Sequence, residues 1–225
     1  MARPRLRRFG RTERAAHWLL AATFFVMLFT GLCLSVSAFA GILDRPTAKA
    51  WHLWSALALA AGLALIVLLG DRRALARSAR EIDRFDADDG QWLRGAARRA
   101  LNGRPAPPQG RFNAGQKLNA ALIGGLMLVM YVTGGLLWYG ERDTTYRFAG
   151  TVIVHDWATL ILMCLVAGHL YLAVLHPSTR HALRGMTLGD VDEEWARRHH
   201  AKWVESDPAM TPVRAPTPAG TPSAD

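Results

Sequence analysis

The chain has 225 residues, of which 51% are hydrophobic, and its formal net charge at pH 7 is +9. Length alone suits one or two soluble domains. However, the hydrophobic residues are concentrated in four blocks, and the charged residues lie almost wholly between them. This separation excludes an ordinary soluble globular domain and indicates a membrane protein.

Four apolar segments account for the hydrophobicity, at about residues 15–37, 51–70, 118–139 and 152–175. Each is about as long as the ~20 residues that a helix needs to cross the hydrocarbon layer. None contains Lys, Arg or Glu, and only the fourth contains an Asp. Helices of this length that are apolar on all sides are typical of membrane spans. The sequence therefore predicts an all-α integral membrane protein, folded as a four-transmembrane-helix bundle.

The first segment has a second interpretation, because a basic start and Ala38-Phe39-Ala40 resemble a signal peptide with its cleavage site. Its apolar stretch is longer than the ~7–15 residues of a signal-peptide core. It also carries His17 and Trp18 at its start. We therefore expect this segment to remain as the first span.

The basic residues indicate the orientation of the spans. Six lie before the first span, ten lie in the stretch 71–111, and six follow His176, whereas the two other connections hold two each. Because cytoplasmic segments are enriched in Lys and Arg, we expect cytoplasmic termini and a cytoplasmic connection 71–117. The charge then reflects topology and contact with the lipid bilayer rather than nucleic-acid binding.

The parts outside the spans carry weaker signals. The connection 71–117 predicts one or two short surface helices, whose acids are expected to form a solvated face. These acids are Asp71, Glu81, Asp83, Asp86, Asp88 and Asp89. Residues 204–225 are rich in Pro, Thr and Ala and are expected to be disordered, so the membrane domain covers residues 1–203. Cys33 and Cys164 lie in apolar spans without CxxC spacing and are expected to be buried structural thiols.

Four histidines lie in the spans, where an unpaired imidazole is costly. In the expected orientation, His17 lies near the inner face, whereas His52 and His155 lie near the outer face. His169 follows His155 by fourteen residues. This spacing places it about 21 Å deeper and within about 40° of the same side of the helix. The histidines therefore form an outer pair, His52 with His155, and an inner pair, His17 with His169.

Two pairs at two depths favour two cofactors stacked across the membrane. One metal ion cannot bridge ligands about 21 Å apart, and no Cys or carboxylate completes a zinc site at either pair. Haem needs only two axial ligands from the protein, so each pair suits one haem. Six glycines would leave room for a flat macrocycle or would serve close helix packing. They are Gly31, Gly124, Gly125, Gly134, Gly135 and Gly168.

The remaining histidines are expected to serve other purposes. His176 ends the fourth span and is expected at the membrane interface. His181, His199 and His200 lie in the tail and are expected to be solvated or to face a partner. No residue of this chain is predicted to be catalytic.

Several motifs together resemble a known family. They are RRFGRTERAAHW around His17, NAGQKLN from Asn113, the spacing of His155 and His169, and WARRHHAKW in the tail. They are similar to the gamma subunit of respiratory formate dehydrogenase, a di-haem cytochrome b of a three-subunit complex. The resemblance covers the chain from about Arg7 to about Trp203. The ERxxHW motif is shared with related cytochromes of hydrogenases, whereas NAGQK and HHxxW are narrower.

The resemblance implies specific sites. The outer haem b would be ligated by His52 and His155, and the inner haem b by His17 and His169. A quinone, either menaquinone or ubiquinone, would bind near the inner haem beside Asn113, Gly115 and Gln116. Asn and Gln offer donors and acceptors to a quinone carbonyl, but Asn113 also suits a helix N-cap.

The resemblance also implies a function and partners. Formate would be oxidised on a molybdenum or tungsten alpha subunit outside the membrane. Electrons would then pass through an iron–sulfur beta subunit and two haems b to quinone on the cytoplasmic side. A higher oligomer of the complex is left open.

Two alternatives stay open at this point. In the nearer one, the di-haem cytochrome b serves a hydrogenase or another molybdoenzyme, because the electron donor is determined by the partner subunits. In the more distant one, the chain is a haem-free membrane anchor or a transporter whose histidines relay protons.

Overall fold

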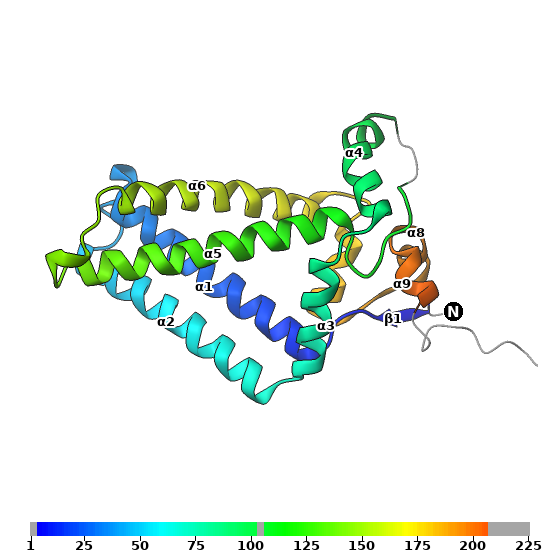
Figure 1. Ribbon diagram of the computed structural model, residues 1–225, viewed down its shortest axis with the longest axis horizontal. Coiled ribbons are helices and arrows are strands. Elements are labelled where there is room, and N and C mark those ends of the chain that lie inside the picture. The colour runs from blue at the N-terminus through cyan, green and yellow to red at the C-terminus, as the bar shows by residue number, and fades with distance from the viewer. Residues whose placement is uncertain (1–3, 103–105, 207–225) are drawn as a thin grey trace, which may run out of the picture.

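The computed structural model describes residues 4–102 and 106–206, and four long helices dominate it (Figure 1). They are α1 (Arg11–Ser35), α2 (Arg45–Leu69), α5 (Ala114–Gly140) and α6 (Thr151–Leu170), the last extended by a π-helical turn (Tyr171–Leu175). All four are long and apolar enough to cross a membrane. The prediction of a four-transmembrane-helix bundle is therefore confirmed.

Three of these helices begin four to six residues before the predicted spans. The Asp44 carboxylate caps α2 by accepting a hydrogen bond from the backbone N–H of Thr47 at 2.9 Å. The Asn113 side chain caps α5 by accepting one from the backbone N–H of Gln116, also at 2.9 Å. Such caps satisfy the first N–H groups of a helix, which have no partner within it. These helices therefore begin before the first residues of the apolar segments, which determined the predicted starts of the spans.

The four helices form two hairpins. Helix α1 packs along α2, and α5 packs along α6, whereas close backbone contacts between the two hairpins are few within the described residues. Figure 1 shows the four helices running side by side. Large apolar side chains cover their outward surfaces; Leu69 is 83% exposed and Leu128 is 67% exposed. Lipid is the environment in which such a surface is stable.

The long connection forms two helices, α3 (Arg72–Asp83) and α4 (Ala87–Asn102), as the sequence predicts. The prediction that its acids form a solvated face is wrong for one of them, Asp89, whereas Glu81 stays partly exposed but forms an ion pair. Asp89 is 2% exposed because its carboxylate pairs with the Lys117 ammonium at 2.6 Å. The Glu81 carboxylate pairs with the guanidinium of Arg111, also at 2.6 Å. These acids hold the connection against the start of α5.

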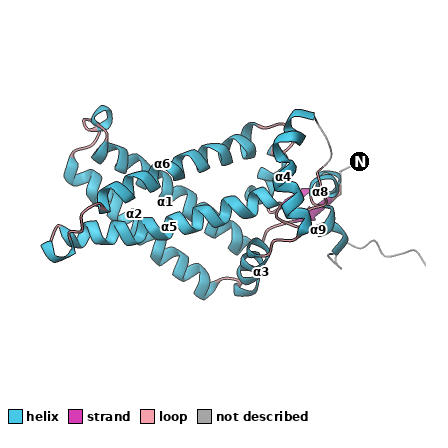
Figure 2. Cartoon of the chain, turned by 45° about the horizontal axis from the view of Figure 1, so that its top comes forward, coloured by secondary structure: helices cyan, strands magenta, loops and turns pink. Residues whose placement is uncertain are grey.

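Short elements close one end of the bundle and form what we call the terminal cap (Figure 2). The cap consists of β1 (Arg5–Arg7), β2 (Asp190–Asp192), α7 (Leu183–Thr187), α8 (Glu193–His199) and α9 (Ala201–Ser206). In addition to these cap elements, the described residues form three 3-10 turns in the connections of the chain, at Ser37–Phe39, Thr144–Tyr146 and Arg180–Ala182. The strands pair antiparallel, with Leu6 opposite Val191. Val191 belongs to a small apolar core with Trp195, Ala196, Trp203 and Val204.

Two tail histidines were expected to be solvated or to face a partner, but in the structure both pack within the terminal cap. His200 is 1% exposed, and its Nδ1 lies 2.7 Å from the carbonyl oxygen of Gly110. The His199 ring stacks on Trp195, with ring centres 4.9 Å apart. Both rings are therefore part of a folded core, because the tail packs back against the segment before α5.

Two smaller expectations concern the cysteines and the chain end. Cys33 is buried, as predicted, but Cys164 is exposed, because α6 packs mainly on α5 and leaves the rest of its surface uncovered. The tail predicted to be disordered starts at residue 204, but residues 204–206 complete α9. The remainder of that tail lies outside the described residues.

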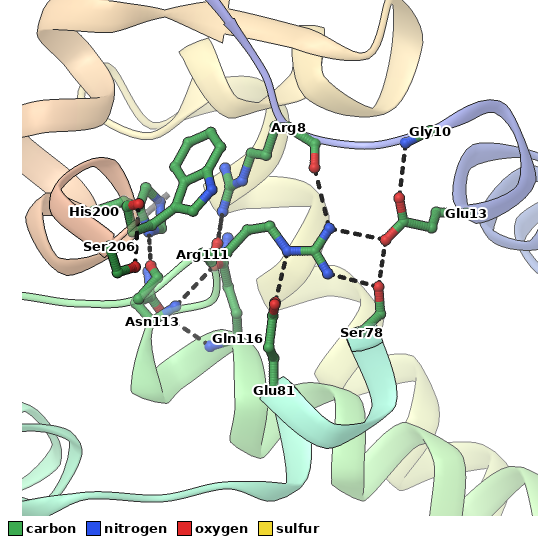
Figure 3. Close-up of polar contacts among 12 residues, drawn as sticks. Arg8, Gly10, Glu13, Ser78, Glu81, Arg111, Asn113, Gln116, His200 and Ser206 are labelled. Atoms are coloured by element: carbon green, nitrogen blue, oxygen red, sulfur yellow. Dashed lines mark hydrogen bonds and ion pairs between the residues drawn. The ribbon is translucent and has the colours of Figure 1, made fainter. Parts of the chain in front are cut away.

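A buried polar network joins the terminal cap to the helices (Figure 3). Nη1 of Arg111 donates to the Glu13 carboxylate at 2.9 Å and to the Arg8 carbonyl at 3.1 Å. Nη2 of Arg111 donates to the Ser78 hydroxyl at 2.7 Å, and that hydroxyl also contacts Glu13. In return, Nη2 of Arg8 donates to the Arg111 carbonyl at 2.6 Å. Residues from the segment between β1 and α1, from α1, from α3 and from the segment before α5 are thereby held in one place.

Candidate functional site

The structure brings the four membrane histidines together in two pairs. His52 of α2 and His155 of α6 have ring centres 6.3 Å apart. His17 of α1 and His169 of α6 have ring centres 6.2 Å apart. In each pair one ring comes from the α1–α2 hairpin and the other from the α5–α6 hairpin. Each pair is therefore a place where side chains of the two hairpins meet.

The spacing within each pair fits two axial ligands of one iron. A histidine nitrogen lies about 2 Å from the metal that it ligates, and the ring centre lies about 1 Å behind that nitrogen, so two opposite ligands have ring centres about 6 Å apart. The observed 6.3 Å and 6.2 Å agree with this value. No group of three or more His, Cys, Asp or Glu that could hold a metal ion occurs in the described part of the chain. A cofactor that brings its own equatorial ligands is the kind that these residues suit.

Threonines and glycines surround the outer pair. The Thr30 hydroxyl lies 3.1 Å from Nδ1 of His52, and the Thr133 hydroxyl lies 2.8 Å from Nδ1 of His155. A Cβ added at Gly31 or at Gly134 would lie 3.5 Å from Cε1 of the adjacent ring. With Nδ1 engaged, Nε2 is the nitrogen left for a metal. The sequence interpretation missed both threonines, although the Thr-Gly pair before each histidine was a readable signal.

The other glycines singled out in the sequence have more room. A Cβ at Gly124, Gly125, Gly135 or Gly168 would meet no atom within 4 Å. These positions are therefore not needed for close helix packing within the chain. Space of this kind around the histidines also suits a flat macrocycle.

The inner pair lies where α1 enters the terminal cap. The ring of Trp18 contacts the His17 ring edge-on, with ring centres 5.5 Å apart. Nε1 of Trp18 donates to the carbonyl of Met186 at 2.9 Å. The start of α1, and with it His17, is thereby tied to α7.

The three residues expected at a quinone lie at the start of α5. The Gln116 side-chain oxygen accepts from the backbone N–H of Asn113 at 3.1 Å, which completes a reciprocal cap. The same oxygen accepts from Nη2 of Arg8 at 3.2 Å. A Cβ at Gly115 would lie 2.9 Å from the Trp92 ring, so glycine is needed for close packing there. The helix-cap interpretation of Asn113 therefore describes its contacts, in which the side-chain oxygens of Asn113 and Gln116 are the atoms engaged.

Besides His199 and His200 of the tail, two further histidines, His176 and His181, lie away from the pairs. Nδ1 of His176 lies 3.1 Å from the hydroxyl of Ser178, just after the π-helical turn. His181 is exposed in the cap. Neither one faces another histidine of the spans.

Comparison with known proteins identifies the family. The family model described as prokaryotic cytochrome b561 matches residues 8–189. This chain belongs to the prokaryotic cytochrome b561 family. Membership implies haem b as a cofactor and agrees with the four apolar helices.

Three relatives of this cytochrome carry informative names. The formate dehydrogenase cytochrome b556 subunit of Haemophilus influenzae is 24% identical over 212 residues, which cover 90% of this chain and 84% of the relative. The cytochrome b556(fdo) subunit of formate dehydrogenase from Escherichia coli K12 is 24% identical over 219 residues, covering 92% and 96%. The nitrate-inducible cytochrome b556(Fdn) subunit of the same organism is 29% identical over 97 residues, covering 42% and 43%.

Proposed function

We propose that this chain is the cytochrome b subunit of a formate dehydrogenase complex. It would accept electrons from a periplasmic iron–sulfur subunit and deliver them, by way of two b haems, to quinone at the cytoplasmic side. The observation that carries this proposal is the presence of two histidine pairs, each spaced as the axial ligands of one iron. Relatives named as formate dehydrogenase subunits over nine-tenths of the chain support the choice of complex.

The protein's part in this function is to hold and separate two redox centres. Haem supplies the one-electron chemistry when it is bound. His52 and His155 would hold the outer haem, and His17 and His169 the inner haem. The fourteen residues between His155 and His169 separate the two levels by about 21 Å along α6. The surrounding apolar helices would exclude water, which is one of the means by which a protein tunes a haem potential.

The orientation follows from the basic segments. Four spans place both termini on one side of the membrane, and the terminal cap gathers the chain's two described ends there. Positive charge is typical of cytoplasmic segments. We therefore assign the cap to the cytoplasm of the bacterial inner membrane.

The opposite end suits an iron–sulfur partner. The Lys49 ammonium pairs with the Glu141 carboxylate at 2.5 Å, and the two residues come from different hairpins. The contact joins the ends of α2 and α5 at the face away from the cap. Segments 44–49 and 141–147 thus form one polar surface, on which an iron–sulfur subunit is expected to bind, with the catalytic subunit beyond it.

Histidine variants in the assembled complex test this function. His52→Ala and His155→Ala should each remove one of two haems and leave the same inner haem, because each variant breaks the same pair. His17→Ala and His169→Ala should each remove the other haem. The haem content and the reduced-minus-oxidised spectrum measure this, together with formate-dependent quinone reduction. Loss of the inner haem alone in His52→Ala would refute the pairing.

The quinone assignment to Asn113, Gly115 and Gln116 has a separate test. Asn113→Asp keeps the oxygen that caps α5 but removes the amide donor, whereas Asn113→Ala removes both. If the amide donates to a quinone carbonyl, both variants should raise the quinone concentration needed for half-maximal reduction. Only Asn113→Ala should also lower stability, by about 1 kcal/mol. Unchanged quinone dependence in Asn113→Asp would show that Asn113 caps α5 and does not bind quinone.

A further inference from the structure

The outer pair is built from two copies of one local arrangement. Thr30 and Gly31 lie on α1, and His52 follows Thr30 by 22 residues on α2. Thr133 and its neighbouring glycine lie on α5, and His155 follows that threonine by 22 residues on α6. Each hairpin therefore presents a histidine on its second helix to a Thr-Gly pair on its first.

The two copies agree in their contacts. The hydroxyl-to-Nδ1 distances are 3.1 Å for Thr30 and 2.8 Å for Thr133. Both threonines are buried, at 2% and 7% exposure. The glycine beside each threonine lets the ring approach, since an added Cβ would already lie 3.5 Å from Cε1 in both copies. Two independent hairpins thus place a threonine hydroxyl at Nδ1 of an imidazole, and in the α1–α2 hairpin the backbone of Met27 also hydrogen-bonds to His52.

The direction of these hydrogen bonds follows from counting protons. Each hydroxyl also lies close to the carbonyl four residues earlier in its helix, 2.8 Å from Val26 and 2.7 Å from Val129. A threonine hydroxyl has one proton and two lone pairs. When that proton goes to the carbonyl, the hydroxyl oxygen accepts the Nδ1–H of the histidine. Nε2 is then unprotonated and has a lone pair for a metal.

We infer that Thr30 and Thr133 are positioning residues of the outer haem site, which fix the ring orientation and tautomer of His52 and His155 and lower the redox potential of the outer haem. This inference rests on the proposed function. A ligating imidazole that donates its other N–H to an acceptor is a stronger electron donor to iron. Stronger donation stabilises the ferric state and lowers the potential.

The inner pair differs from the outer pair in this respect. Within the described ranges, no side-chain hydroxyl hydrogen-bonds to the ring of His17 or His169. The hydroxyl contacts therefore lower the potential of the outer haem and not that of the inner haem. This difference favours electron flow from the outer site to the inner site, which is the direction of the proposed function.

Valine variants of the two threonines test the inference, because valine keeps the shape and removes the hydroxyl. Thr30→Val, Thr133→Val and the double variant would be studied in the complete complex by redox titration followed optically. Each single variant should shift the midpoint potential of one haem to a more positive value, and the double variant should shift it further. The other haem should keep its potential, and Thr30→Ser and Thr133→Ser should keep wild-type values.

Thr23→Val is the matched control, since its hydroxyl contacts only carbonyls of its own helix, the nearer being Leu19 at 2.8 Å. Loss of one haem in the valine variants with retention in the serine variants would also support the positioning role. Unchanged potentials in the valine variants, or loss of haem in the serine variants as well, would overturn it. If the wild-type complex contained no haem, the proposed function itself would fail, so the two failures are distinguishable.

Discussion

Arg111 is the residue at which most buried contacts near the terminal cap converge. Its side chain is 4% exposed and pairs with Glu13, whose side chain is 6% exposed. Burial and then the charge of Arg111 lower the pKa of the nearby Arg8 to about 9, so the Arg8 guanidinium stays charged at neutral pH. Two buried cations are tolerated here because carboxylate, carbonyl and amide oxygens accept most of their hydrogen bonds, although Nε of Arg8 has no partner among the described residues.

Replacing Arg111 should therefore destabilise the protein strongly. Arg111→Met leaves the Glu13 carboxylate buried without its cation, which typically costs about 3–5 kcal/mol. Unfolding of the purified protein in detergent by added denaturant measures the change. Arg197→Met is the control, because Arg197 forms an exposed pair with Glu193 within α8 and should change stability by less than about 1 kcal/mol. Equal effects of the two variants would contradict the assigned role.

His200 makes the terminal cap sensitive to acid. Burial, followed by the charge of Arg8, lowers the pKa of His200 well below its ordinary 6.5. As the pH falls below about 6.5, His200 binds a proton in the unfolded chain but not in the folded chain. The free energy of unfolding therefore declines by up to about 1.4 kcal/mol per pH unit. Thermal unfolding followed by tryptophan fluorescence at pH 7.5 and pH 5 should show this loss.

A variant separates His200 from other titrating groups. His200→Gln should show a smaller difference in stability between pH 7.5 and pH 5 than the wild-type protein. His181→Gln, at an exposed position, should keep the wild-type difference. An identical pH dependence in all three proteins would show that His200 does not limit stability in acid.

At the scale of elements, the parts that could be predicted are those fixed by local pattern. The spans follow from apolar runs of sufficient length, and the pairing of depths follows from helical rise and the alternation of spans. The terminal cap could not be predicted in this way. Its strands place Arg5 opposite Asp192. Each strand has only three residues, which is too short for a recognisable alternating pattern, so the strands are defined only by their contact with each other.

The same reasoning applies to the candidate site. His17, His52, His155 and His169 can be named from the sequence as candidates because imidazoles in apolar spans are unusual. Thr30 and Thr133 were missed although a Thr-Gly pair precedes each outer histidine, since threonine in a span is ordinary and its contact depends on a ring from the next helix.

The turn before β2 provides a test at this scale. Gly189 has φ of +95°, and its backbone carbonyl accepts hydrogen bonds from the N–H groups of Arg8 and Phe9 at 2.8 and 3.2 Å. A Cβ added there would lie 2.8 Å from the Phe9 carbonyl. Gly189→Ala therefore combines left-handed strain, of order 1–3 kcal/mol, with a backbone clash.

Gly150→Ala is the matched control for this substitution. Gly150 has φ of +85°, but a Cβ there would meet nothing within 4 Å. It should incur the strain alone, so thermal unfolding should occur at a lower temperature in Gly189→Ala than in Gly150→Ala. The reverse order would mean that the contact between Gly189 and the β1 end does not hold the cap.

At the scale of the whole molecule, two hairpins are joined by imidazole pairs and closed at one end by the terminal cap. Orientation is testable directly. Green fluorescent protein fused after the last residue should fluoresce, as it does when it folds in the cytoplasm, and alkaline phosphatase inserted in segment 141–150 should be active. Activity of the phosphatase at the C-terminus instead would reverse the assigned orientation.

The stoichiometry of haem in the purified complex decides whether the two histidine pairs bind two haems. Haem is extracted and measured as its pyridine complex, and the amount is divided by the amount of this chain. A ratio of two, with two b-type components in the reduced-minus-oxidised spectrum, is the result that two histidine pairs predict. A ratio of one, or the absence of haem, would contradict the account.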